Sequence, residues 1–417
     1  MKTRLAELIE RLRVPGASLA YWHGGETHVE VAGVLNRDTG VAVTPDSVFQ
    51  FGSVTKVWTT AQIMLLAEQG RLTLDTPVAD LIPAIGGGVT VRQLLCHTSG
   101  IDGDFFHDTG RGDDCLERYV ADVAERERIH EPGAVHSYSN SGFVIAGRIV
   151  ELLTGKTWDA ALREQIVEPL GLTRTVTLPE DVLRFRSAIG HPDGPPSPVW
   201  GLMRSLGPAG LICSTPSDMV AFGRSFLEGT LLCLGGVTAM ASRQIALPDT
   251  AHGTHWGLGW TLDTWQGEDV WMHGGNTIGQ SSMLWVVPST GTVVALVSNG
   301  GDESTLAHTV AGELFPELTG LTPPAPPLPT WALTDLTAFE GVYERTGVRM
   351  TISGTSLTYE HLGDLAGRLE FELAAESETS ALARKVGEES WHRVVFASMP
   401  DGRPYAYFAA RSTPKLP

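Results

Sequence analysis

The stretch VFQFGSVTK, from Val48 to Lys56, decides the fold, because it joins a strand-like run to the start of a long apolar helix. Within it, Ser53 and Lys56 are three residues apart. If Ser53 opens the helix, Lys56 lies one turn later on the same face, where its amine reaches the serine hydroxyl. The helix N-terminus adds positive potential at that hydroxyl, and a partly desolvated lysine can lose its proton. The pattern therefore predicts a serine nucleophile with a lysine base.

The S-x-x-K spacing is a weak signal on its own, and the chain holds a second copy at Ser412–Lys415. Pro414 prevents a helix there. The copy at Ser53 differs, because a helical pattern follows it up to Gly70, which suits a helix C-cap. The alternative interpretation is an exposed serine and a solvated lysine on an ordinary helix. That alternative requires the two motifs described next to be coincidental.

Two further motifs follow in order along the chain. Tyr138 and Asn140 stand two apart before a helical stretch that is expected to open at Ser141, so both side chains can face Ser53. A buried tyrosine and a turn asparagine are the alternative. The third motif, His273-Gly274-Gly275-Asn276, follows a strand, and its glycines let a substrate backbone approach the strand edge. The backbone N–H groups of Ser53 and Asn276 would then form an oxyanion hole.

In this order, S-x-x-K, Y-x-N and H-x-G resemble the motifs of the serine β-lactamase/DD-peptidase superfamily. Three further segments also resemble sequence segments of that family: LLCHTSGI at 94–101, AGLICST at 209–215 with Asp218, and WGLGW at 256–260. The resemblance covers about residues 10–315. It implies that Ser53 is the nucleophile and Lys56 the general base. It further implies that Tyr138 relays a proton to the leaving group and that Asn140 binds the substrate amide or orients Lys56. His97 is expected to brace a loop.

The third motif departs from the family pattern at one position. Class C β-lactamases have lysine where this chain has His273, and a neutral or titrating histidine supplies a weaker charge for a substrate carboxylate. The relatives with histidine here tend to be esterases, D-peptidases or acyl-transfer enzymes. His273 can alternatively be a structural histidine.

The chain divides into three parts by composition: a catalytic domain at 1–318, a linker at 319–332 and a C-terminal domain at 333–417. Residues 321–329 contain five prolines in nine positions, typical of a stiff linker. We expect strands at both ends of the first part with helices between them. The fold class is therefore α/β, an antiparallel sheet flanked by helices with a helical subdomain. Short alternating segments after residue 335 predict a small all-β barrel.

The C-terminal barrel resembles the lipocalin-like domain of some D-aminopeptidases and of penicillin-binding-protein-type thioesterases, which cyclise nonribosomal peptides. In the thioesterases an arginine near the C-terminus meets the substrate carboxylate. Arg411 is the candidate by its position, and a surface or barrel arginine is the alternative.

The charge of the chain limits the kinds of binding partner that we expect. The 417 residues include 30 Lys+Arg against 48 Asp+Glu, a formal net charge of −18, so neither nucleic acid nor an anionic membrane surface is an expected partner. The N-terminal segment has the spacing of an amphipathic helix, so a signal peptide is not expected. Four scattered cysteines fit free thiols, and the cytoplasm is the expected location. No metal or organic cofactor is expected, and the oligomeric state stays open.

The expected activity is acyl transfer through an ester on Ser53, with an ester or a D-amino-acid-containing peptide as the donor. Water as the acceptor makes the protein a hydrolase. An amine as the acceptor makes it an amide-forming acyltransferase or a peptide macrocyclase. A hypothesis of another class is a sensor that is acylated once and never turns over.

Overall fold

The computed structural model describes residues 4–192, 194–251, 253–329, 335–362, 367–388 and 390–417. The helices are α1 (Leu5–Arg11), α2 (Thr55–Glu68), α3 (Val91–Leu95), α4 (Cys115–Ala124), α5 (Asn140–Thr154), α6 (Trp158–Leu162), α7 (Pro179–Val182), α8 (Gly207–Gly210), α9 (Pro216–Glu228), α10 (Leu234–Met240) and α11 (Glu303–Thr319). No helix within these ranges is long and apolar enough to cross a membrane.

An antiparallel sheet organises the first part of the chain, with the strand order β2-β1-β10-β9-β8-β7-β6-β5. Its strands are β1 (Gly16–His23), β2 (Glu26–Gly33), β5 (Ile245–Ala246), β6 (His255–Trp256), β7 (Thr261–Trp265), β8 (Glu268–Asn276), β9 (Ser281–Val287) and β10 (Thr292–Ser298). The N-terminal hairpin pairs with β10; its partner residues Ala17 and Ser298 are 281 positions apart. The prediction that the two halves of the sheet come from distant parts of the chain is confirmed.

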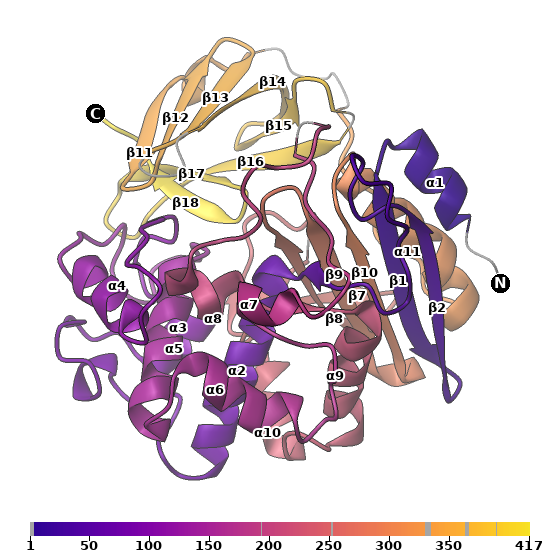
Figure 1. The fold of residues 1–417 in the computed structure, drawn as a ribbon. Coiled ribbons are helices and arrows are strands. Elements are labelled where there is room, and N and C mark those ends of the chain that lie inside the picture. The colour runs from indigo at the N-terminus through magenta and orange to yellow at the C-terminus, as the bar shows by residue number, and fades with distance from the viewer. Residues whose placement is uncertain (1–3, 193, 252, 330–334, 363–366, 389) are drawn as a thin grey trace.

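Helices cover both faces of this sheet, and β10 shows why. Its residues are apolar on both sides: Val293, Ala295 and Val297 join the core shared with the helical subdomain, while Val294 and Leu296 join the core under α1 and α11. Side chains alternate between the faces of a strand, so a strand buried on both faces has a continuous apolar sequence. Figure 1 shows α1 and α11 on one side of the sheet and α2, α5 and α9 on the other.

A barrel follows the Pro-rich segment, in the sequential strand order β11 to β18. Its strands are β11 (Gly341–Arg345), β12 (Val348–Ser353), β13 (Ser356–His361), β14 (Gly367–Ser377), β15 (Ser380–Lys385), β16 (Trp391–Ser398), β17 (Pro404–Phe408) and β18 (Arg411–Pro414). A bridge between Tyr343 and Lys415 joins its first strand to its last, so the barrel is nearly closed. The predicted fold class, including a barrel that fits a lipocalin-like domain, is confirmed.

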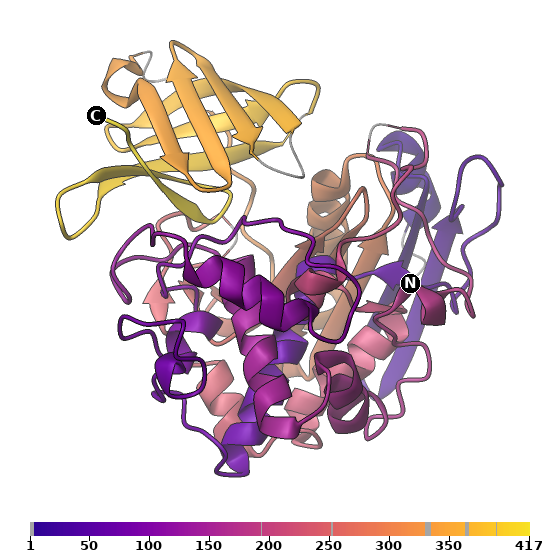
Figure 2. The same cartoon turned by 60° about the vertical axis from the view of Figure 1, so that its left-hand side comes forward.

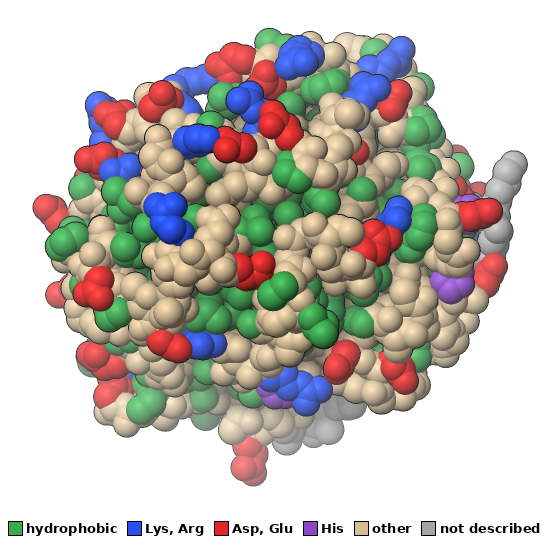
Figure 3. Space-filling view, turned by 90° about the horizontal axis from the view of Figure 1, so that it is seen from below, with side chains coloured by type: hydrophobic (Ala, Val, Ile, Leu, Met, Phe, Trp, Pro, Cys, Tyr) green, Lys and Arg blue, Asp and Glu red, His purple; other side chains and the backbone are tan. Residues whose placement is uncertain are grey.

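The barrel lies at one end of the catalytic part, above the loops that carry the predicted site (Figure 2). The predicted boundaries at 318 and 332 stay a prediction: α11 ends at Thr319 and β11 begins at Gly341, and residues 330–334 lie outside the described residues. On the face farthest from the barrel, acidic and basic side chains are interspersed (Figure 3). The excess of negative charge is therefore not gathered into a single acidic patch on that face.

Candidate active site

Ser53 lies in a tight turn between the sheet and the helical subdomain. The two-residue strand β3 (Phe49–Gln50) leads into a 3-10 turn, Gly52–Val54, which continues directly into α2. Gly52 has φ +51°, and a Cβ there would lie 2.6 Å from the Asn276 carbonyl oxygen. Only glycine therefore allows this close approach to β8 in a left-handed conformation. Ser53 itself is half-buried, so its hydroxyl stays accessible.

The end of β8 forms the other wall of this turn. β7 pairs with β8 only as far as Met272, so Gly274, Gly275 and Asn276 extend past it with β9 as their partner strand. A Cβ on Gly275 would lie 2.0 Å from the Phe51 carbonyl oxygen and 2.7 Å from the backbone nitrogen of Ser53. The glycine-lined strand edge predicted from the sequence is thus in contact with the serine turn.

Lys56 is the predicted base, and its surroundings favour the neutral amine. Its Nζ lies 3.0 Å from Ser53 Oγ and donates to the Ala209 carbonyl at 2.7 Å, while the side chain is fully buried. Burial lowers the pKa of Lys56 well below 10.5. The nearby guanidinium of Arg411 adds to this effect, and the carboxylate of Asp104 opposes it. A neutral amine at hydrogen-bond distance can accept the serine proton.

Tyr138 packs over this lysine. Its ring centroid lies 4.8 Å from Lys56 Nζ and 4.7 Å from Arg411 Cζ, and the His97 ring stacks on it at 4.2 Å. Burial raises the pKa of Tyr138 above its ordinary value, against the opposing effect of the Ser53 hydroxyl, so the phenol keeps its proton at neutral pH. The Tyr138 hydroxyl is buried and makes no hydrogen bond of standard geometry with the described residues.

His97 braces the Tyr138 segment, as expected. Its Nδ1 accepts a hydrogen bond from the Ser139 backbone N–H at 2.9 Å, and it adopts φ +59°. Burial lowers the pKa of this fully buried imidazole well below 6.5. His97 therefore holds a backbone turn in place as a neutral group.

Asn140 begins α5, one residue earlier than predicted, and its amide donates to Asp104 Oδ1 at 3.4 Å. The hydrogen bonds of the Lys56 amine go to Ser53 Oγ and to the Ala209 carbonyl. The two roles expected for Asn140, binding the substrate amide or orienting Lys56, stay predictions.

His273 is neutral. Its Nδ1 lies 2.6 Å from the Gly274 carbonyl oxygen, which can only accept, so the proton is assigned to Nδ1. Burial lowers the pKa of His273 to about 3, and the Lys56 amine acts in the same direction. Nε2 is buried and has no partner within the described ranges, so it presents a lone pair toward the site. This position therefore supplies an acceptor where class C β-lactamases have a cation.

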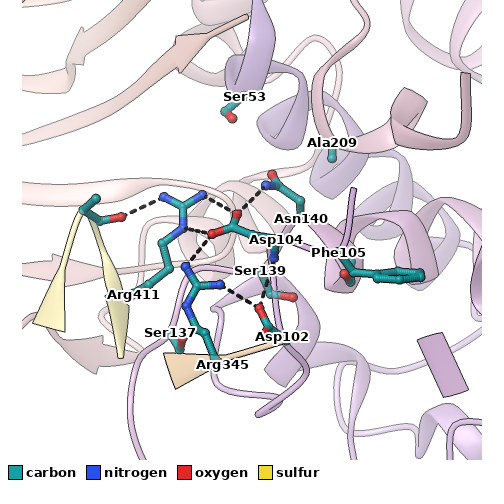
Figure 4. Close-up of polar contacts among 12 residues, drawn as sticks. Ser53, Asp102, Asp104, Phe105, Ser137, Ser139, Asn140, Ala209, Arg345 and Arg411 are labelled. Carbon is teal, nitrogen blue, oxygen red and sulfur yellow. Dashed lines mark hydrogen bonds and ion pairs between the residues drawn. The ribbon is translucent and has the colours of Figure 1, made fainter. Parts of the chain in front are cut away.

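Arg411 reaches the site from β18, although 307 residues separate it from its partner Asp104. Nε and Nη2 donate to the two carboxylate oxygens of Asp104 at 3.1 and 3.0 Å, and Nη1 donates to the Ala409 carbonyl at 2.7 Å. Figure 4 shows Ser53 on one side of this pair and Arg345 with Asp102 on the other. The arginine predicted by position lies at the site, held by a carboxylate.

The barrel also holds the backbone around Tyr138. The Tyr138 N–H donates to the Ala410 carbonyl at 2.9 Å, and Ser412 Oγ donates to the His136 carbonyl at 2.8 Å. The hairpin between β17 and β18 thus acts as an extra strand beside the Y-x-N segment. Sequence reasoning named Arg411 but missed Asp104 and its other arginine partner, Arg345, because no local pattern connects a loop at 104 to strands 241 and 307 residues later.

Within the described ranges, no group of three or more His, Cys, Asp or Glu side chains is placed to hold a metal ion. The described cysteines are all free thiols.

Comparisons with known proteins agree with this geometry. The Beta-lactamase family model matches residues 1–313. Penicillin-binding protein 4 of Amycolatopsis lactamdurans is 44% identical over 362 residues, which covers 80% of this chain and 94% of that protein. The structure of SurE with D-Leu superposes with a TM-score of 0.80 at 26% identity, covering 99% of this chain and 97% of SurE.

A D-amino acid amidase from Ochrobactrum anthropi SV3, complexed with L-phenylalanine amide, has a TM-score of 0.62 at 27% identity. It covers 71% of this chain and 89% of the amidase. The likeness to SurE therefore includes the C-terminal barrel, whereas the amidase matches a smaller share of the chain.

Proposed function

Because the chain belongs to the β-lactamase family, we propose that it is a serine acyl-transfer enzyme that forms an ester on Ser53. The single observation that carries this proposal is the 3.0 Å contact between the half-buried Ser53 hydroxyl and the fully buried Lys56 amine. A lysine is costly to bury as a cation, so the site favours the neutral base that the chemistry requires.

The steps follow from the positions of the groups. Lys56 accepts the hydroxyl proton while Ser53 Oγ bonds to the acyl carbon. The backbone N–H groups of Ser53 and Asn276, brought together by Gly52 and Gly275, would hold the developing oxyanion. The bond to the leaving group then breaks, and the leaving group takes the proton that Lys56 had accepted, delivered through the Tyr138 hydroxyl. An acceptor attacks the ester and loses its proton to Lys56, which returns a proton to Ser53 Oγ as the acyl product leaves.

We infer an acyl donor that ends in a D-amino acid residue, as an ester or a peptide. The support comes from the relatives: SurE was crystallised with D-Leu, and the Ochrobactrum protein is a D-amino acid amidase. His273 supports the same class, because its neutral Nε2 can accept a hydrogen bond from a substrate N–H but cannot pair with a carboxylate.

Water is the acceptor in the primary proposal. Amide formation with an amine acceptor, including macrocyclisation, is the second candidate, and the placement of Arg411 favours it. In the penicillin-binding-protein-type thioesterases that the barrel resembles, an arginine near the C-terminus meets the substrate carboxylate. Arg411, bound to Asp104 and 4.7 Å from the Tyr138 ring centroid, is the candidate for that role here.

The test uses p-nitrophenyl esters of N-acetyl-D-leucine and N-acetyl-L-leucine. We expect an adduct on Ser53 by intact mass, sustained release of nitrophenol, and faster release from the D ester. Ser53→Ala should lose both signals, and Ser242→Ala, at an exposed serine, should keep them. Full activity in Ser53→Ala would refute the proposal. A single stoichiometric burst would identify a sensor, and an amide product on addition of an amine would identify a transferase.

A further inference from the structure

A chain of four charged side chains, three of them buried and Arg411 partly exposed, connects the barrel to the candidate site. It consists of Asp102, Arg345, Asp104 and Arg411, and is called the ion chain below. We propose that Arg345 is a positioning residue: through Asp104 it holds Arg411 and Asn140 beside Ser53 and sets the electrostatic potential at Lys56. The inference rests on the proposed function, because it assigns Lys56 the role of base.

The contacts of Arg345 fix its guanidinium completely. Nη1 donates to Asp102 Oδ1 at 2.7 Å, and Nη2 donates to Asp104 Oδ2 at 2.5 Å and to the Tyr359 hydroxyl at 3.2 Å. Nε donates to Thr413 Oγ1 at 3.3 Å. Arginine presents its donors in a rigid planar fork, so these contacts orient Asp104 as well as bind it. Figure 4 shows the resulting order, with Asp104 between the two arginines.

Asp104 is the common hydrogen-bond acceptor of Arg345, Arg411 and Asn140. It accepts from Arg345, from Arg411 through two nitrogens, and from the Asn140 amide. Its side chain is 1% exposed. Burial raises the pKa of Asp104, but the two guanidiniums outweigh burial and hold the pKa below its ordinary value, so the carboxylate is ionised. An ionised carboxylate in this position needs both arginines.

A backbone turn of the barrel packs closely against the loop 102–104. Gly347 follows β11 in the turn that leads to β12, and a Cβ on it would lie 2.2 Å from the Asp104 carbonyl oxygen. The turn therefore packs backbone against backbone at Asp104. On the opposite side of the loop, a Cβ on Gly103 would lie 2.2 Å from the Tyr138 carbonyl oxygen. The loop 102–104 is held between the barrel and the Tyr138 segment without room to shift.

The net charge of the ion chain is zero, because it contains two carboxylates and two guanidiniums. Removing one buried member leaves an uncompensated charge near Lys56. The charged groups acting on Lys56 are Arg411, which lowers its pKa, and Asp104, which raises it; the neutral rings of His273 and His97 face it as well. Loss of Arg345 makes the potential at Lys56 more negative and favours the ammonium. Loss of the Asp102 charge does the opposite.

The experiment therefore uses two substitutions of opposite sign. The rate of Ser53 acylation by N-acetyl-D-leucine p-nitrophenyl ester is measured from pH 4 to 10 in Arg345→Met, Asp102→Asn and the wild type. The acid limb of kcat/KM reports the free enzyme's base. We expect the acid limb of kcat/KM to shift to higher pH by about half a unit or more in Arg345→Met, and to lower pH in Asp102→Asn. The matched control is Arg349→Met, an exposed arginine on β12 paired with Glu344, which should leave the limb in place.

Arg345→Lys separates charge from geometry. It keeps the positive charge and loses the fork, so kcat/KM should fall at least tenfold while the acid limb stays where it is in the wild type. If Arg345→Met fails to fold, Arg345→Lys and Asp102→Asn still decide the question. Acid limbs that coincide in all variants, or that move in the same direction in Asp102→Asn and Arg345→Met, would overturn the inference.

Failure of the proposed function gives a different result. If the wild type forms no adduct on Ser53 with any ester, the proposed function fails and the inference falls with it. A wild type that is acylated, beside variants whose limbs do not move, overturns the inference about Arg345 alone.

Discussion

At the scale of single residues, the fully buried Lys56 is the feature with the largest consequences. An amine without an ionised partner in hydrogen-bond contact is destabilising as a cation, because burial removes its hydration. The burial that activates Ser53 in the proposed mechanism is therefore expected to lower the stability of the folded protein. Stability and activity oppose one another at this position.

Lys56→Met is expected to abolish acylation and to stabilise the protein at neutral pH. The folded state holds Lys56 neutral, whereas the unfolded chain binds a proton up to the ordinary pKa of 10.5. Between the folded and unfolded pKa values the unfolded state binds the extra proton, so wild-type stability rises with pH. The advantage of Lys56→Met should shrink by about 1.4 kcal/mol for each pH unit as the pH rises toward 10.5.

Urea unfolding at pH 7, 8 and 9 measures this difference. Lys156→Met is the control, because that lysine is largely exposed and pairs with Glu164, and its effect on unfolding should not change across this range. A Lys56→Met variant less stable than the wild type at every pH would contradict the expectation.

The residues that carry short motifs could be predicted from the sequence, and Arg411 was a candidate by its position, but Asp102, Asp104 and Arg345 could not be predicted. Ser53 and Lys56 are one helical turn apart, so their spacing in the sequence is enough to predict that their side chains meet. Asp104 and Arg345 meet only because the barrel docks on the loop 102–104, and no spacing rule reaches across 241 residues. The direction of the Asn140 amide also depends on Asp104. No spacing rule predicts that partner of Asn140 either.

At the scale of elements, the close approach of β8 to the serine turn determines the geometry of the site. Gly275→Ala is expected to destabilise the protein by about 1–3 kcal/mol, because its Cβ would meet backbone atoms on both sides. It should also lower the acylation rate at least about 100-fold, since a small displacement of a nucleophile is costly.

Gly312→Ala is the matched comparison for Gly275→Ala. Gly312 lies inside α11, and a Cβ there meets nothing within 4 Å, so alanine should stabilise the protein by about 1 kcal/mol through helix propensity. Thermal melting and Ser53 acylation measure both variants. Wild-type acylation by Gly275→Ala would show that the contact of β8 with the turn is not needed.

The strands of the main sheet were largely predictable, and two strands of the barrel were missed. Strands β8, β9 and β10 lie where apolar runs indicated them. β15 has the sequence SALARK, in which alanines and basic residues have low strand propensity, and β18 is RSTP, with a proline. Pairing with longer neighbours makes these segments strands. The hairpin between β17 and β18 also requires φ +49° and +65° at Ala409 and Ala410, which no turn signal indicated.

At the scale of the whole molecule, the barrel is a structural part of the candidate site. It supplies Arg411, the acceptor for the Tyr138 N–H, and the partners of Asp102 and Asp104. A further ion pair joins Arg393 of β16 to Asp249. The barrel and the catalytic part therefore depend on each other for the satisfaction of buried charges.

Truncation after Pro329 is expected to reduce Ser53 acylation at least tenfold, since Tyr138 loses its backbone partner and its neighbour Arg411. Circular dichroism establishes whether the truncated chain is folded, and intact mass measures acylation. A full-length chain with Gly-Ser in place of the prolines at 323–329 is the control for linker stiffness, and it should be acylated at the wild-type rate. A folded, truncated chain with wild-type acylation would show that the barrel is dispensable for the chemistry.

The contact between Ser412 and Ser137 spans 275 residues. At roughly 5–20 residues per second, translation needs on the order of 15–55 s to pass from one to the other. Ser53 and Lys56 are synthesised first. During that interval the chain lacks Arg411 and the hairpin between β17 and β18, which hold Tyr138. Until synthesis has passed β18, a nascent chain therefore lacks the contacts that hold Tyr138 in the folded protein.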